Sequence, residues 1–147
     1  MTEPPEPSRP VVLDTGIWGH LYVNKKPDAR TPYWRRLLTG RTLVIATQTR
    51  AEVLYGLYAA KWGPARLTAA TARLDATNTV PVDEDIIQAY ARLSTDCKAA
   101  GHALHADKHS GDMWIAATAL VLTADLLSAD HIFRGAPGLY LLPPDEP

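Results

Sequence analysis

Short apolar runs alternate along the chain with longer segments in which apolar residues recur at helical spacing. The short runs predict buried β-strands, and the periodic segments predict amphipathic helices. Their alternation indicates a parallel sheet in an α/β protein. Pro81 lies in the third run and favours the edge of the sheet for that strand. The predicted strands lie at 11–13, 42–46, 79–82, 126–128 and 139–142, and the predicted helices begin near 17, 31, 49, 64, 84 and 111.

Composition narrows the class of protein. A chain of 147 residues that is 46% hydrophobic fits one domain, which we expect at 10–147. The Pro-rich segment 1–9 has no apolar core, so we expect a disordered leader rather than a signal peptide. No apolar run approaches the ~20 residues of a membrane span. Cys97 is the only cysteine, which excludes an intrachain disulfide and favours a reducing compartment such as the cytoplasm.

Four acids lie where predicted strands end or predicted helices begin. Asp14 and Asp130 follow the first and fourth strands, whereas Glu52 and Asp112 lie near the start of two helices. In a parallel sheet these positions share one edge, so the four carboxylates can converge there. Clustered carboxylates repel one another unless one takes up a proton or a cation binds. Mg²⁺ accepts carboxylates, waters and phosphate oxygens, so the pattern indicates metal-assisted phosphodiester hydrolysis.

Most of these acids also have a purely structural interpretation. Glu52 completes a capping box that begins at Thr49, Asp112 can cap its helix, and Asp130 can be a turn residue. Asp14 is the hardest to explain in this way, because its strand needs no acid.

Two other patterns suggest different chemistry. His102, His105 and His109, together with Asp107, have spacings that suit zinc, but a structural site usually needs further ligands and there is no cysteine pair. Contact with a phosphate backbone or a solvated loop are the other interpretations of these histidines. The triplet 14–16, Asp-Thr-Gly, matches that of dimeric aspartic proteases, but those chains are nearly all β, whereas this chain becomes helical at once.

Four segments carry a resemblance to PIN-domain ribonucleases, and among these to the VapC toxins of bacterial toxin–antitoxin pairs. The segments are Val-Leu-Asp-Thr at 12–15, Thr-Arg-Ala-Glu-Val-Leu-Tyr-Gly at 49–56, Gly-Asp-Met-Trp-Ile-Ala-Ala-Thr-Ala at 111–119, and 126–133. They come in the order of the family, and the resemblance extends from about residue 11 to 142. It implies a three-layer α/β/α fold with a short central parallel sheet.

The resemblance also implies the chemistry of the site. It implies that Mg²⁺ or Mn²⁺ is held by four acids and that two hydroxyl side chains assist them through hydrogen bonds. It further implies cleavage of single-stranded or looped RNA to 5′-phosphate and 3′-hydroxyl ends, a homodimer, and an inhibitory antitoxin protein. The chain departs from the commonest pattern in its longer Pro-rich leader and in its His-rich segment, which carries an extra acid. The acids are Asp14, Glu52, Asp112 and Asp130, and the hydroxyls belong to Thr15 and Ser128.

Three functions follow as hypotheses: a metal-dependent endoribonuclease toxin, a catalytically silent PIN-like module that binds protein or RNA, and an RNA-processing nuclease without an antitoxin. The presence of all four acids favours a nuclease over the silent module. Charges nearly balance, with 15 Lys plus Arg against 16 Asp plus Glu, so RNA binding needs a local basic rim. Our candidates for this rim flank the acids: Lys108, His109, His131 and Arg134.

For the antitoxin we expect a groove between the first two helices and the helix that carries Glu52. An amphipathic partner helix in such a groove would bury aromatic anchors. The apolar residues around it are Trp18, Tyr22, Trp34, Leu38, Leu54 and Tyr58, most of which also suit the core.

Overall fold

The computed structural model describes residues 9–147; residues 1–8, most of the predicted leader, lie outside the described part. Within that part, five short strands form one sheet in the order β3-β2-β1-β4-β5, and every neighbouring pair is parallel. This confirms the predicted parallel α/β sheet and the edge position of the third strand. The strands are β1 (Val11–Leu13), β2 (Leu43–Ala46), β3 (Asn78–Val80), β4 (Asp125–Leu127) and β5 (Tyr140–Leu141).

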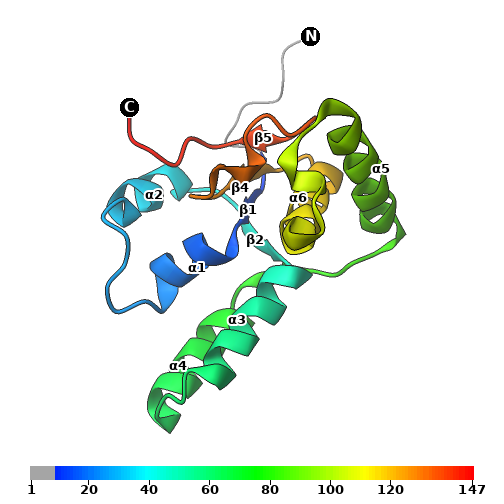
Figure 1. Cartoon of the computed structure of the whole chain (residues 1–147). Coiled ribbons are helices and arrows are strands. Elements are labelled where there is room, and N and C mark those ends of the chain that lie inside the picture. The colour runs from blue at the N-terminus through cyan, green and yellow to red at the C-terminus, as the bar shows by residue number, and fades with distance from the viewer. Residues whose placement is uncertain (1–8) are drawn as a thin grey trace.

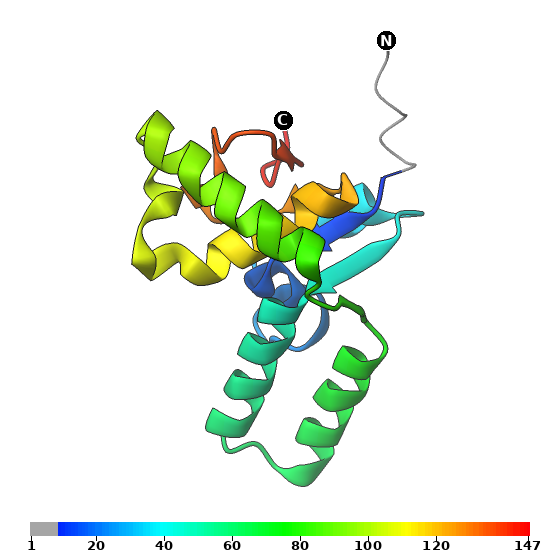
Figure 2. The same ribbon diagram turned by 90° about the vertical axis from the view of Figure 1, so that its right-hand side faces the viewer.

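Helices cover both faces of the sheet and make the predicted three layers (Figure 1). α5 and α6 pack together on one face, and α1 and α2 lie on the other. α3 and α4 form a hairpin that projects away from the sheet (Figure 2). The helices are α1 (Thr15–Tyr22), α2 (Thr31–Leu38), α3 (Thr47–Ala59), α4 (Pro64–Asp75), α5 (Glu84–Ala100) and α6 (Ser110–Leu122), with short 3₁₀ turns η2 (Ala103–His105), η3 (Asp107–His109) and η4 (His131–Phe133).

The central strand β1 divides the core in two. Val11 and Leu13 join the cluster under α1, α2 and the base of the hairpin, whereas Val12 joins the cluster under α5 and α6. Successive side chains of a strand point to opposite faces, so three apolar residues in a row predict a strand that is covered on both sides. None of the described helices is long and apolar enough to cross a membrane.

The predicted ends of α5 are confirmed in detail. Asp83 accepts a hydrogen bond from the backbone N–H of Ile86, as an N-cap residue does. Gly101 ends the helix with a φ of 69°, which glycine adopts without strain.

The amino end of the sheet is joined by an ion-pair cluster that the sequence does not reveal. Asp125, the buried first residue of β4, pairs with Arg9 and with Arg41, which come from the segments before β1 and β2. Arg9 is only 6% exposed, so the packed domain includes a residue that we had assigned to the leader.

The predicted apolar groove is largely part of the core. Trp18 and Trp34 are fully buried and Leu38 is nearly so, which leaves Tyr22 and Leu54 half-buried. Tyr58 is different, because 73% of it is exposed on the projecting hairpin. Helical spacing alone marks an apolar face, and the neighbouring elements then decide how much of that face is covered.

Candidate active site

Asp14 lies where β1 ends and α1 begins. Its carboxylate accepts hydrogen bonds from the backbone N–H of Thr15, at 2.8 Å, and from the hydroxyl of Ser128, at 2.6 Å. Ser128 directly follows β4, the neighbour of β1. Burial raises the pKa of Asp14 to about 6 in spite of these hydrogen bonds, and the negative charges of Asp112 and Glu52 raise it further. The carboxylate is therefore costly to ionise in the absence of a cation.

Glu52 is not part of a capping box, so that interpretation was wrong. α3 begins two residues before Thr49, which places Thr49 inside the first turn and leaves its hydroxyl 3.1 Å from that of Thr15. Glu52 accepts hydrogen bonds from the Thr15 hydroxyl, at 2.8 Å, and from the side-chain amide of Gln48, at 2.9 Å. Contacts with α1 have replaced the local cap.

Asp112 lies in the first turn of α6 but is not its N-cap residue. That position belongs to His109, whose Nδ1 is 3.1 Å from an Asp112 carboxylate oxygen. Burial raises the pKa of Asp112, and the charges of Asp130 and Glu52 act in the same direction, whereas the His109 hydrogen bond lowers it. His109, a candidate for RNA contact, thus already holds one of the acids.

Asp130 confirms its structural interpretation and still acts on the other acids. Its carboxylate caps η4 by accepting from the backbone N–H of Ile132, and its own N–H donates to Ser128 Oγ, both at 3.0 Å. Its charge nevertheless contributes to the raised pKa of Asp112. Ser128 therefore connects the segment of Asp130 to Asp14.

The carboxyl edge of the sheet thus brings the four predicted acids within electrostatic range of one another. They come from β1, α3, α6 and the segment after β4, elements that are distant in sequence. In the described residues, no group of three or more acids, histidines or cysteines is assembled as a metal site. Each carboxylate instead has a protein hydrogen-bond donor: Thr15, Gln48, His109, Ser128 or a backbone N–H.

The sequence matches the family model described as the PIN domain over residues 11–139. The chain belongs to the PIN domain family. Among curated proteins, no sequence matches it. The family supports a nuclease, and hence a hydrolase, as the class of enzyme.

Solved structures with a similar fold are named as toxin–antitoxin proteins or their complexes. VapBC2 from Rickettsia felis, bound to a promoter DNA fragment, has a TM-score of 0.73 at 23% identity, covering 90% of this chain and 96% of the other. FitAcB from Neisseria gonorrhoeae has a TM-score of 0.74 at 22% identity, covering 91% and 97%. VapBC-5 from Mycobacterium tuberculosis, named as a toxin–antitoxin system, has a TM-score of 0.65 at 22% identity, covering 91% and 98%.

The histidines of this PIN domain organise the loop before α6. His102 Nδ1 accepts from the backbone N–H of Leu104, so its Nε2 carries the proton and donates to the Arg134 carbonyl at 2.7 Å. His105 Nδ1 lies 2.7 Å from the His102 carbonyl. These bonds, together with the absence of an assembled metal group among the described residues, leave the zinc interpretation without structural support.

Sequence reasoning missed the glycine that lets two elements of the PIN domain meet. A Cβ at Gly111 would lie 3.0 Å from the Gln48 amide nitrogen and 3.3 Å from a Glu52 carboxylate oxygen. Any side chain there would push α6 away from α3. The available signal was a glycine directly before an acid at a helix start.

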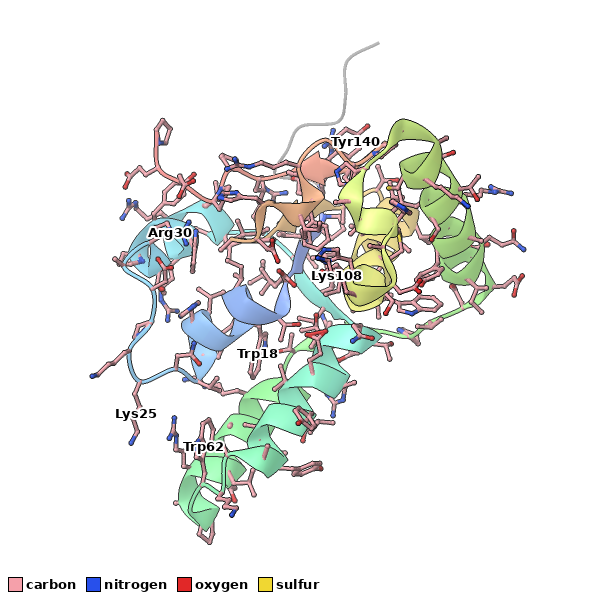
Figure 3. The ribbon with its side chains drawn as sticks, viewed as in Figure 1. Trp18, Lys25, Arg30, Trp62, Lys108 and Tyr140 are labelled. Carbon is pink, nitrogen blue, oxygen red and sulfur yellow. The ribbon has the colours of Figure 1, made fainter. Side chains whose placement is uncertain are left out.

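The remaining candidates for RNA contact lie at the surface. Lys108, His131 and Arg134 are exposed. Lys108 lies just before α6, near the middle of the view in Figure 3.

Proposed function

We propose that this PIN domain is a metal-dependent endoribonuclease toxin that hydrolyses phosphodiester bonds in single-stranded or looped RNA and is neutralised by a cognate antitoxin. One observation carries the proposal. Four acids from four separate elements meet at the carboxyl edge of the sheet, and the pKa values of Asp14 and Asp112 are raised there. Perturbed carboxylates of this kind are typical of functional sites.

The donor set fits a hard divalent cation, Mg²⁺ or Mn²⁺. Carboxylate oxygens are the ligands that such ions prefer, and a cation would relieve the repulsion that raises the two pKa values. When bound, the ion supplies an acidified water and stabilises charge on the phosphate. Because the carboxylates are not assembled as a metal site, binding requires some of them to exchange their present donors. The proposed ligands are Asp14, Glu52, Asp112 and Asp130.

The other polar residues orient these acids and the RNA. The Thr15 hydroxyl fixes Glu52 and the Ser128 hydroxyl fixes Asp14, which limits the directions in which the two carboxylates can turn. Lys108, His131 and Arg134 are free to meet the RNA backbone or bases, since their side chains form no hydrogen bond or ion pair within residues 9–147. His109 is better suited to hold Asp112 than to bind RNA.

An antitoxin partner and a homodimer complete the proposal. The similar solved structures are named as toxin–antitoxin complexes, which supports a protein partner. The half-buried Tyr22 and Leu54 and the exposed Tyr58 are the remaining anchors for its amphipathic segment.

The test is cleavage of a single-stranded RNA in Mg²⁺ and in EDTA, with mapping of the new ends. We expect 5′-phosphate ends in Mg²⁺, no cleavage in EDTA, and loss of cleavage in Asp14→Asn. Asp96→Asn, an exposed acid on α5, is the matched control and keeps activity. Undiminished cleavage in EDTA or in Asp14→Asn contradicts the metal mechanism. RNA binding without cleavage by the wild type favours the silent PIN-like module, which the lack of an assembled ligand group also suggests.

A further inference from the structure

A pocket of about 300 Å³ lies beside the acids, between η4 and the C-terminal segment 141–145. We propose that this pocket takes one unpaired nucleobase of the RNA substrate, next to the phosphate that the acids attack. The inference rests on the proposed function and adds a base-reading subsite to it.

The position of the pocket ties it to the acidic edge. Its wall includes Ser128, the residue that donates to Asp14, and also Asp130 itself. A base in the pocket is therefore next to the carboxylates, and the phosphate attached to its nucleotide can reach them.

The lining suits an uncharged planar group better than a phosphate. Phe133, Leu142 and Pro143 supply apolar surface, and Arg134 supplies hydrogen-bond donors at the rim. Asp130 and Asp145 also line the pocket, and their carboxylates would repel a phosphate. A base edge presents acceptors that an arginine can bind and amino groups that a carboxylate can bind. The volume lies at the lower end for small-molecule sites, so it suits a single base.

Both walls of the pocket are fixed by distant contacts. The C-terminal segment is held on α2, where Tyr33 donates to the Pro143 carbonyl at 2.9 Å and Trp34 to the Pro144 carbonyl at 2.8 Å. Arg30 pairs with Asp145 at 2.8 Å; Arg30 is labelled beside α2 in Figure 3. The preformed shape reduces the ordering cost of binding.

The opposite wall is held by the histidine at the start of the His-rich segment. The ring of His102 donates to the carbonyl of Arg134, so the backbone of this residue is fixed while its guanidinium stays exposed. This gives a function to a histidine that neither a zinc site nor the acids use.

The experiment separates recognition of the base from contact with the phosphate. Short single-stranded RNAs that carry one abasic nucleotide, moved along the sequence, are titrated against the protein in EDTA, with a gel to verify that they stay intact. For the wild type we expect binding to weaken by about tenfold when the abasic nucleotide falls at the pocket, since a good base contact is worth that much.

Arg134→Met should bring the ratio between intact and abasic RNA close to one. Arg92→Met, an exposed arginine on α5, removes the same charge and keeps the ratio. Equal wild-type affinity for all the abasic RNAs overturns the proposal, as does an Arg134→Met variant that weakens both RNAs equally. A preserved ratio with no cleavage in Mg²⁺ contradicts the nuclease but leaves the base pocket intact.

Discussion

Removing the charge of Asp14 should stabilise the metal-free protein at alkaline pH. The carboxylate is partly buried at the end of β1, and its pKa is raised from 3.8 to about 6. This difference corresponds to about 3 kcal/mol between the protonated and ionised forms of the folded protein. Asn is isosteric and uncharged, but its amide replaces one acceptor of the Thr15 and Ser128 hydrogen bonds, a loss of about 1 kcal/mol.

The pH dependence has a definite sign. Because the pKa is higher in the folded than in the unfolded chain, the stability that the proton confers is fully present below about pH 4 and is lost as the pH rises through about 6. At pH 8 the ionised Asp14 opposes folding, so Asp14→Asn should gain about 1–2 kcal/mol. For a domain of this size that gain corresponds to a rise in Tm of about 3–6 °C.

The assay is denaturation by urea and by heat in EDTA, at pH 8 and at pH 4. The gain should be present at pH 8 and absent at pH 4, whereas Asp96→Asn should show no such dependence. An Asp14→Asn variant that is less stable than the wild type at pH 8, or equally stabilised at both pH values, would refute the argument that burial of charge dominates at this site.

Four further outcomes test the site. Mg²⁺ or Mn²⁺ should raise the Tm of the wild type by mass action, and the rise should shrink in Asp112→Asn; thermal scans with and without metal decide this. His109→Asn keeps a donor where Nδ1 lies and should retain metal affinity, whereas His109→Gln should lose about tenfold or more by calorimetry, as for other outer-shell partners. Gly111→Ala should lower RNA cleavage more than it lowers Tm, because its Cβ presses on Gln48 and Glu52; a variant with full activity contradicts the close approach. An antitoxin segment that sends a basic side chain to the acids should bind more weakly in millimolar Mg²⁺, since coupling between two ligands is reciprocal; equal affinities at matched ionic strength exclude competition.

Local patterns determined most of the secondary structure. Three apolar residues before Asp14 predicted β1, the acid at 83 and the glycine at 101 predicted both ends of α5, and Pro81 predicted an edge strand. These features depend on side-chain periodicity or on hydrogen bonds within one turn, so the residues involved are close in sequence. The four acids were also predicted from sequence, because the ends of parallel strands share an edge.

Only the tertiary structure decided what each side chain contacts. Glu52 matches a capping box by sequence, yet its partner is Thr15, 37 residues away, and Ser128 reaches Asp14 across 114 residues. A local motif gives way when a distant hydroxyl offers a better partner inside the fold. In the same way, Trp18 is buried and Tyr58 is exposed although both lie on apolar helix faces. Burial and long-range hydrogen bonds arise from the order of the strands and the packing of the layers, so no short segment of the chain encodes them alone.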